Sequence, residues 1–543
     1  MLWNWRRAWR KEPNPDYDEA RCSESLCRIL KRKADSEKSL SAQMKRRADN
    51  RIRELRNRNP GPAIMKLRRK TVKSRQFLTV CGLSMNGIND RMIIKYKKLG
   101  PIKEADLEIG DMTVICGGNN TGKTYLSYSI FGLFKLWEQL ADFSIGNEYI
   151  DELSEKGFIR IDLKKFEQKT DKVISAIFKK YSENIQFVFS SQEDEFSDLV
   201  IQGNIDKIAV DYSDGIESVY GTKKNRIIQI RKEADSTLLE ITILSKNLND
   251  IPPISFLESV INISLTEFFF KNLPNPFLIP AERSGIALFY KELDIHKNVL
   301  LEQLTRYERS TDFNPFDMMG KVMARYPLPI KEHIDFIRDL EQIKKQKSSL
   351  IQSKYPKGIE SILEGSFKIH KEEVVFYAKN PKDKRRRTPV PLYLSSSAAK
   401  SLLGLDVYLK HAASEGDLLL IDEPELNLHP DNQRKIARLL ATLVNRKIKV
   451  LITTHSDYIV KELGNLVMLS NNFKGKKSIL RKYKYKKEQF LSPSQLKVYI
   501  ADNGTIENVY VDSKSGIEIE TFDKVINEMN SSSEDIYFSI NAE

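Results

Sequence analysis

Cysteine is scarce in this chain, with only 4 cysteines in 543 residues. They are Cys22, Cys27, Cys81 and Cys116. This number is too small for a disulfide framework, and Cys116 ends an apolar run that enters a glycine-rich turn, where a crosslink would be out of place. The cysteines therefore predict a protein of the reducing cytoplasm.

Long hydrophobic runs are also missing. No stretch approaches the roughly 18 apolar residues that a membrane-spanning helix needs. The charged N-terminus lacks the apolar segment of a secretory signal. We therefore expect no membrane partner.

The sequence shows no nuclease signature of its own. Its 6 histidines are scattered, and they form neither an H-N-H motif nor a metal-ligand cluster. No acidic cluster of the kind that a metal-dependent nuclease needs follows His455. We therefore predict that this chain does not cut nucleic acid itself.

Positive charge is concentrated at one end. Residues 1–91 hold 24 of the 88 Lys and Arg but 10 of the 74 Asp and Glu, so the remainder holds 64 of each and is neutral. Three interpretations of this basic extension stay open: a disordered arm that contacts RNA or DNA, a solvated helical extension, or an upstream translation that the functional protein lacks. Met92 begins a strand-like run and is a plausible natural start.

A glycine-rich turn is the clearest functional motif. Residues 112–115 predict a buried strand and residues 125–136 predict a helix, and the turn between them matches G-x-x-x-x-G-K-[ST]. Backbone N–H groups at a helix N-terminus hold phosphates, with Lys123 at the β- and γ-phosphates and the Thr124 hydroxyl on Mg²⁺. The predicted ATP-binding residues are Gly117, Gly118, Asn119, Asn120, Thr121, Gly122, Lys123 and Thr124.

Two further strands supply the other half of a nucleotide site. Residues 418–421 are apolar and precede Asp422 and Glu423, as at the end of a buried parallel strand. We expect Asp422 to lie behind the bound Mg²⁺. We expect Glu423 to face the γ-phosphate, where it positions or deprotonates the attacking water. Residues 450–454 form a second such strand, followed by His455, which one intervening helix brings next to the acidic strand and to the γ-phosphate.

A serine-rich turn around Ser395 opens a predicted helix. Taken alone it is a helix cap. It also stands where a helix N-terminus receives the γ-phosphate of a partner subunit.

Upstream, Glu282 and Arg283 follow a predicted buried strand at 277–280, and a surface salt bridge is the ordinary interpretation of such a pair.

The region 145–390 predicts an inserted helical and β region. Helices are expected at 125–143, 172–180 and 257–270, and strands at 158–163, 185–190, 207–211, 226–230 and 238–244. Residues 314–353 predict a short packed or coiled helical arm. Residues 365–378 and 388–394 predict a hairpin with a basic tip at 382–387, a second candidate for a nucleic-acid contact. Residues 474–487 predict strands, and 517–529 a helix.

In this order, the motifs resemble the ABC-class ATPases, and within them the group of the overcoming-lysogenization-defect and RecF/SMC-like proteins. The PtuA-type ATPases of Septu antiphage systems, including versions encoded with a retron, are similar in the same motifs. The resemblance implies an α/β ABC-type ATPase domain over 92–543, with a mixed sheet and flanking helices. It also implies ATP and Mg²⁺ as ligands, and a head-to-tail homodimer or higher oligomer that brings Ser395 to the partner's ATP. A separate HNH endonuclease, and a reverse transcriptase with its RNA–DNA hybrid, are the partners that it implies.

The chain departs from this pattern at two places. The serine-rich turn around Ser395 corresponds to the signature motif of these ATPases. Ser397 stands where that motif normally has a glycine, which predicts looser γ-phosphate sensing or slower hydrolysis. The glutamine that usually follows the first helix has three candidates, Gln139, Gln186 and Gln192. Three functions therefore stand: an antiphage ATPase that controls a nuclease, a RecF/SMC-like DNA-repair ATPase, and a module that uses ATP as a structural ligand.

Overall fold

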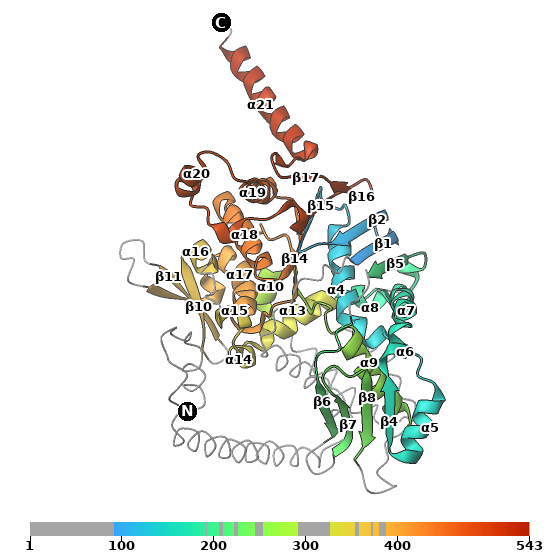
Figure 1. Ribbon diagram of the computed structural model, residues 1–543. Helices are drawn as coiled ribbons and strands as arrows, with labels where there is room; N and C mark the ends of the chain where they lie inside the picture. The colour runs from blue at the N-terminus through green and yellow to red at the C-terminus, as the bar shows by residue number, and fades with distance from the viewer. Residues whose placement is uncertain are drawn as a thin grey trace, which may run out of the picture. The chain divides into compact units, whose positions relative to one another are not determined.

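The computed structural model describes residues 92–191, 193–205, 210–221, 226–244, 254–290, 326–352, 358–370, 373–379 and 387–541 (Figure 1). These residues divide into two compact units. The smaller contains Gly146–Asp162 and Tyr212–Leu257, and the larger contains the described parts of Gly87–Ile145, Leu163–Asp211 and Glu258–Glu543. The basic extension 1–91, most of the basic tip (382–386), and Gln192 lie outside the described residues.

A nine-stranded mixed sheet forms the centre of the larger unit, in the order β5-β1-β2-β16-β15-β3-β14-β13-β9. Its strands are β1 (Met92–Leu99), β2 (Ile102–Ile109), β3 (Met112–Gly117), β5 (Val200–Ile205), β9 (Pro276–Ile279), β13 (Leu418–Asp422), β14 (Lys449–Thr454), β15 (Leu496–Asp502) and β16 (Thr505–Val509). The predicted α/β class, with a mixed sheet and flanking helices, is confirmed.

The predicted strand pair after Met92 is present. β1 and β2 run antiparallel, with Met92 opposite Ile109 and Leu99 opposite Ile102. Gly100 takes the positive φ of 55° that the tight turn between them requires. The pair leads directly into β3, which ends at the phosphate loop.

Four neighbouring strands, β3, β14, β13 and β9, are parallel. The residues of β13 are all buried, as are those of β14 after Lys449, so these strands show continuous apolar runs instead of alternation. The carboxyl ends of parallel strands meet at one edge of a sheet. This edge therefore collects the phosphate loop, the residues after β13 and the residues after β14.

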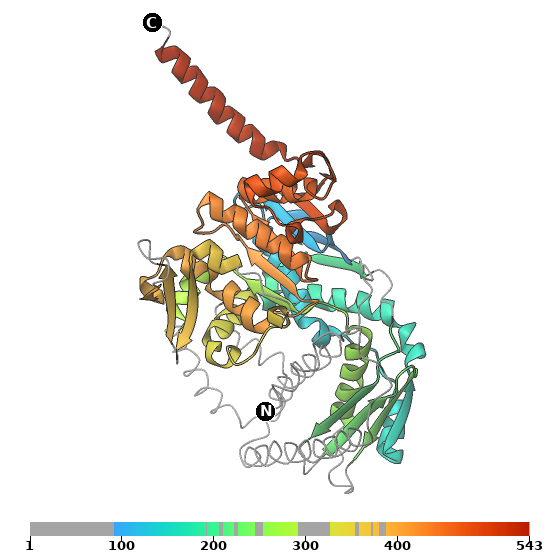
Figure 2. The same ribbon diagram turned by 60° about the vertical axis from the view of Figure 1, so that its left-hand side comes forward.

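Helices cover both faces of these strands (Figure 2). Alternate residues of β3 (Met112, Val114 and Cys116) pack into one core with α17 (Ser397–Val407), α18 (Pro430–Val444) and α19 (Asp457–Met468). The opposite face receives α4 (Lys123–Leu140), which contacts β3, β9, β13 and β14. The core therefore holds the strand ends rigidly where they carry the site.

Most of the insertion predicted at 145–390 belongs to the larger unit, in the part that follows residue 162. Its helices are α6 (Leu163–Glu167), α7 (Thr170–Glu183), α8 (Gln186–Phe189), α9 (Ile254–Phe269, shared with the smaller unit), α10 (Arg283–Phe289), α13 (Leu328–Arg338), α14 (Leu340–Ile343), α15 (Ser349–Gln352) and α16 (Gly358–Leu363). The strand predicted at 185–190 is wrong, because α8 occupies it. Ile334, Ile337 and Leu340 are buried, so the helical arm is packed against the body.

The predicted hairpin forms a three-stranded sheet, in the order β10-β11-β12. Its strands are β10 (Gly365–His370), β11 (Glu373–Lys379) and β12 (Arg387–Pro391). A single 3-10 turn at Leu392–Leu394 then joins it to α17. This sheet therefore connects directly to the serine-rich turn.

In its described residues, the smaller unit is a four-stranded antiparallel sheet with the helix α5 (Asn147–Lys156) and the start of α9. Its strands are β4 (Phe158–Asp162), β6 (Ile216–Gly221), β7 (Arg226–Lys232) and β8 (Leu238–Ile243), in the sheet order β4-β8-β7-β6. Lys232 is buried, and its ammonium donates to the carbonyl oxygens of Tyr212 and Asp214, each at 2.7 Å. These bonds compensate for part of the cost of burying the charge.

The chain after α19 contains two further helices, α20 (Lys476–Tyr483) and α21 (Glu520–Ile540). Besides β15 and β16 it also contains two short strands, β17 (Val511–Asp512) and β18 (Gly516–Ile517). The strands predicted at 474–487 are wrong, since α20 and turns occupy that stretch. The predicted C-terminal helix is present and extends to Ile540. Across the described residues, no helix has both the length and the apolar character that crossing a membrane requires.

Candidate active site

The phosphate loop connects β3 to α4 by a backbone that only glycine adopts easily. Gly117 and Gly122 have φ values of 148° and 92°. A Cβ on Gly117 would lie 2.3 Å from the carbonyl oxygen of Ala501, and a Cβ on Gly122 would lie 2.6 Å from Ile102. Both predicted glycines are therefore required by contacts as well as by φ. Gly118, Asn119 and Asn120 are exposed at the tip of the loop.

Lys123 is buried at the first position of α4. Its ammonium donates to the carbonyl oxygens of Gly118 at 2.6 Å and Gly117 at 3.1 Å. Burial lowers the pKa of Lys123, while the nearby carboxylates oppose this shift. The cation is thus held at the centre of the loop, where a phosphate group would meet it.

Asp422 ends β13 within reach of Thr124. The Thr124 hydroxyl donates to Asp422 Oδ2 at 2.9 Å, and the Thr453 hydroxyl donates to the other carboxylate oxygen. Burial raises the pKa of Asp422, and these two hydrogen bonds oppose the rise. Neighbouring oxygens around an octahedral Mg²⁺ lie about 2.9 Å apart, so the Thr124–Asp422 pair fits this ion. Among the described residues no cluster of three or more His, Cys, Asp or Glu side chains could hold a metal.

Glu423 and His455 lie side by side at the ends of neighbouring strands. His455 Nε2 is 3.1 Å from Glu423 Oε1, and Nδ1 of the same ring is 3.5 Å from the Lys123 ammonium. The hydrogen bond with His455 lowers the pKa of Glu423 despite its partial burial. Glu423 is therefore held as a carboxylate, the form that can position or deprotonate a water molecule.

Glu425 belongs to the acidic run Asp422–Glu425 that carries the family resemblance, but no role was predicted for it; in the structure it fixes the end of β14. Its carboxylate accepts the backbone N–H of His455 at 2.7 Å and the Thr454 hydroxyl at 2.9 Å. These contacts orient His455 toward Glu423. Only the position of Glu425 three residues after Asp422 could have suggested its role, and that spacing is common.

Arg283 is a second side chain whose role the sequence missed. The surface salt bridge expected for it is wrong, because only 2% of Arg283 is exposed. Its guanidinium donates to the carbonyl oxygens of Asp422 at 2.7 Å and Glu423 at 2.5 Å. The neighbouring Glu282 is exposed, and its carboxylate accepts the Tyr128 hydroxyl at 3.3 Å.

Within the described residues, the hydrogen bond of the Ser395 side chain does not go to Lys123, Asp422, Glu423 or His455. Ser395 is buried, and its hydroxyl donates to the carbonyl oxygen of Leu392 at 2.6 Å. Ser396, not Ser395, caps α17, since Ser396 Oγ accepts the N–H of Ala399 at 3.2 Å. Ser397 is the first residue of the helix. The serine-rich turn is thus a helix cap, while the expected contact of Ser395 with a partner's ATP stays a prediction.

Two of the three glutamine candidates, Gln139 and Gln186, lie within the described residues. Gln139 is exposed near the end of α4, 16 residues after Lys123, which places it roughly 24 Å along the helix. Gln186 begins α8 and is half-buried. Neither side chain has a hydrogen bond to Asp422 or Glu423 in the part of the chain that the structure describes.

Comparison with known proteins identifies the domain. A family model described as an AAA ATPase domain matches residues 93–460. Solved structures that are similar include the SMC head domain from Thermotoga maritima, with 10% identity, a TM-score of 0.26, and 78% of this chain and 99% of that chain covered. Another is an SmcHead bound to the C-winged helix domain of ScpA, with 11% identity, a TM-score of 0.28, and 77% and 97% covered. A third is the Smc head domain with an extended coiled coil bound to the C-terminal domain of ScpA, from Pyrococcus furiosus, with 10% identity, a TM-score of 0.27, and 81% and 99% covered. No curated protein matches.

Proposed function

Because this chain belongs to the AAA ATPase domain family, we propose that it binds ATP with Mg²⁺ and hydrolyses it at the edge formed by β3, β13 and β14. The residues proposed to carry the chemistry are Lys123, Thr124, Asp422, Glu423 and His455. The proposal rests on one observation above all: the contacts from Lys123 to His455 to Glu423 join the phosphate loop to both neighbouring strand ends.

Each side chain has a distinct task in this proposal. The loop N–H groups and Lys123 bind the β- and γ-phosphates, and Thr124 and Asp422 would hold Mg²⁺. When bound, Mg²⁺ neutralises charge on the β- and γ-phosphates. Glu423 orients a water for in-line attack on the γ-phosphorus and accepts its proton, while His455 holds Glu423 in place. The products are ADP and inorganic phosphate.

Steady-state ATP hydrolysis tests this assignment. We expect the wild type to turn over ATP, and Glu423→Gln to reduce kcat at least 100-fold while ATP still binds, because the water-activating carboxylate is lost and the binding groups remain. Wild-type protein that binds ATP without turnover would favour the structural-ligand function, which the Ser397 departure also favours. Protein that does not bind ATP would refute both.

We further propose that two chains associate head to tail, so that Ser395 of each meets the ATP of the other. The turn before Ser395 exposes two large apolar side chains, Tyr393 and Leu394, each 67% exposed. Apolar surface beside a polar turn is typical of an interaction site. A two-fold arrangement would use this surface twice, once for each ATP.

The biological role that we propose is antiphage defence, with this ATPase controlling a separate HNH nuclease and acting beside a reverse transcriptase and its RNA–DNA hybrid. The support is the sequence resemblance to the PtuA-type ATPases over the motifs around Lys123, Asp422 and His455. A plaque assay with Lys123→Ala should show loss of protection, and co-purification should recover the products of neighbouring genes. Full protection by Lys123→Ala would contradict this role.

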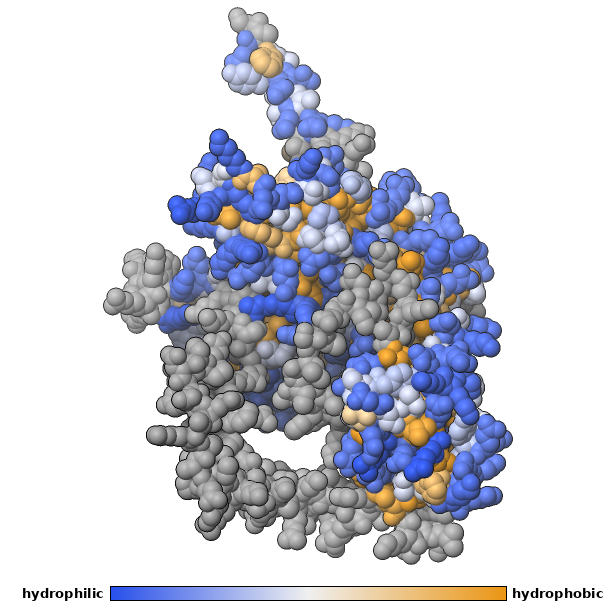
Figure 3. Space-filling view, in the orientation of Figure 1, coloured by the Kyte–Doolittle hydropathy of each residue, from blue (hydrophilic) through white to orange (hydrophobic). Residues whose placement is uncertain are grey.

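A DNA- or RNA-binding role, as in a RecF/SMC-like repair ATPase, is the second candidate. It is favoured by the segment 474–487, which holds eight Lys and Arg and no acidic residue. α20 has no buried residue, and Figure 3 shows hydrophilic surface where it lies. Tyr483 is 47% exposed between these cations, as in surfaces that stack single-stranded bases.

Anisotropy of a labelled single strand tests this second candidate. Replacing Lys477, Arg481 and Lys484 by Gln should weaken binding at least tenfold and reduce its salt dependence, because phosphate contacts are lost. The matched control replaces three surface lysines of β1, Lys95, Lys97 and Lys98, which already pair with carboxylates. Equal loss in both triple variants would argue against a site at α20.

A further inference from the structure

Arg283 is a buried cation at the edge that carries the candidate active site. It follows β9 and begins α10, and only 2% of it is exposed. Burial lowers its pKa to about 10, although four carboxylates nearby favour the charged form. Within the described residues its guanidinium forms no ion pair, and the atoms that receive its hydrogen bonds are backbone carbonyl oxygens.

Two of these carbonyl groups belong to Asp422 and Glu423, where the chain turns at the end of β13. The last pairing of β9 with β13 is Ile279 with Ile421, so β9 has no residue opposite Asp422. Arg283 supplies donors beyond the end of this pairing, to the carbonyl oxygens of Asp422 and Glu423, and its bond to the Pro280 carbonyl oxygen ties it to the end of β9. A buried carbonyl group without a donor would be costly.

The backbone of Glu423 has a conformation that needs such support. Its φ is +51°, a region that a residue with a long side chain seldom adopts. On one side, its N–H donates to the Thr453 carbonyl oxygen at 3.0 Å. On the other side, its carbonyl oxygen accepts from Arg283. The turn is therefore held from β14 and from Arg283 together.

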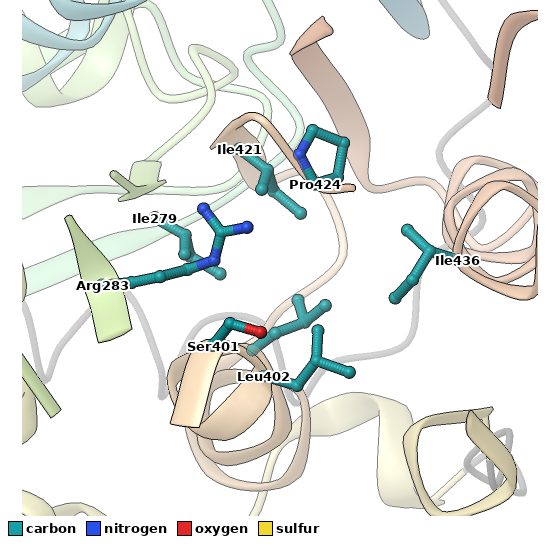
Figure 4. Close-up of a pocket in the computed structure, with 8 residues that line it drawn as sticks. Ile279, Arg283, Ser401, Leu402, Ile421, Pro424 and Ile436 are labelled. Atoms are coloured by element: carbon teal, nitrogen blue, oxygen red, sulfur yellow. The ribbon is translucent and has the colours of Figure 1, made fainter. Parts of the chain in front are cut away.

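Figure 4 shows the guanidinium of Arg283 beside Ile421 and Pro424, with Ser401 and Leu402 of α17 on the opposite wall of a small cavity. Its volume of about 10 Å³ is close to the least space that one water needs. Arg283 thus lies between the helix that follows Ser395 and the turn that carries Glu423.

We propose that Arg283 is a positioning residue for ATP hydrolysis: it fixes the backbone of Asp422 and Glu423 so that the Glu423 carboxylate faces His455 and the attacked phosphate. This inference rests on the proposed ATPase function. In this role Arg283 acts through the backbone carbonyl groups of Asp422 and Glu423, so its loss should impair turnover and leave ATP binding nearly unchanged. Small displacements of a catalytic group are enough to slow a reaction about 100-fold.

The test compares Arg283→Met, Arg283→Lys and wild type for ATP affinity and for kcat. Met keeps much of the side-chain volume and removes every donor, whereas Lys restores a buried cation that can reach one carbonyl. We expect Arg283→Met to lower kcat 10- to 100-fold with ATP affinity within threefold of wild type. Arg283→Lys should recover part of kcat.

Arg438→Met is the matched control. The Arg438 side chain is 15% exposed, and its Nε donates to Glu462 Oε1 at 2.5 Å, between α18 and α19. This variant should lower the melting temperature while kcat stays within twofold of wild type. It shows how much turnover is lost when a buried arginine is removed away from Glu423.

Three results separate the possibilities. If both Arg283 variants keep wild-type kcat, the positioning role is overturned and the ATPase function stands. If ATP affinity falls in step with kcat in both variants, Arg283 has a purely structural role and the inference is also overturned. If wild type neither binds nor hydrolyses ATP, the proposed function fails, and the role of Arg283 fails with it.

Discussion

Lys123 should decide whether ATP binds at all. Lys123→Ala removes the cation at the centre of the phosphate loop, so we expect at least a 100-fold loss of ATP affinity, measured with a fluorescent ATP analogue. Lys135→Ala is the control, because Lys135 lies on the same helix and forms a half-buried ion pair with Glu332 at 2.6 Å. Similar affinities of the two variants would contradict a phosphate-binding role for Lys123.

Asp417 should make the stability of the larger unit depend on pH. It precedes β13, is buried, and accepts from the Tyr408 hydroxyl at 2.8 Å and the Ser414 N–H at 2.9 Å. Burial raises its pKa from 3.8 to about 6. The stabilisation that Asp417 contributes is therefore complete below pH 3.8 and is lost as the pH rises through 6. This loss lowers the free energy of unfolding by about 3 kcal/mol.

Asp417→Asn should remove this dependence. Relative to wild type, the variant should gain about 2–3 kcal/mol between pH 4.5 and pH 8 in urea unfolding, because Asn carries no charge to bury. Asp431→Asn is the control, since Asp431 is exposed and Lys435 lowers its pKa. A gain in the Asp431 variant equal to that of the Asp417 variant would show that burial of Asp417 is not the cause.

The sequence predicted those site residues whose identity is tied to a local motif. Gly117, Gly122 and Lys123 lie in one loop, and Asp422 and His455 each end an apolar strand. Arg283 and Glu425 were missed for a physical reason. Their partners are backbone groups 139 and 30 residues away, and the register of β9, β13 and β14 that joins them is set by the fold.

α17 offers a test of which serine does what. Ser396→Ala removes the bond that caps the helix, so we expect a loss of about 1 kcal/mol of unfolding free energy. ATP-dependent association should remain. Ser395→Ala should abolish ATP-dependent association, measured by light scattering, in addition to any stability lost with the hydrogen bond from its buried hydroxyl to the Leu392 carbonyl oxygen. If Ser395→Ala associates normally with ATP, the proposed contact with the partner's ATP is wrong.

Helices and strands were predicted well where a periodic pattern was long. The stretches at 125–143, 172–180 and 257–270 correspond to α4, α7 and α9. The stretch 185–190 was wrong because its apolar residues pack in a single turn, where Val188 is buried and Phe189 stacks 5.2 Å from Tyr125. In 474–487 the alternation of Lys and Tyr imitates a strand, but residues 476–483 form a short helix that has no buried residue and packs the partly buried Leu480 against the core.

Removal of residues 1–91 should leave ATP binding intact. The contacts described for the phosphate loop, Asp422 and Glu423 all come from residues after 91. β1 begins at Met92 and pairs with both β2 and β5 from that residue on. A truncated protein starting at Met92 should bind a fluorescent ATP analogue with wild-type affinity. Failure of this protein to fold would show that the basic extension belongs to the core.

The proposed head-to-tail association of two chains can be tested with a variant that retains ATP. Glu423→Gln should trap ATP, because water activation is lost while the loop, Thr124 and Asp422 still bind it. With ATP and Mg²⁺, this variant should elute at about twice the 62.7 kDa of one chain. Without ATP, it should elute as wild type does.

Adding Lys123→Ala to Glu423→Gln provides the control for this assay. The double variant lacks the cation that binds phosphate, so it should show no ATP-dependent change in mass. If Glu423→Gln and the double variant have the same mass with ATP, then ATP is not what joins the chains. If both variants have the mass of a dimer with and without ATP, the exposed Tyr393 and Leu394 would serve an interface that forms without nucleotide.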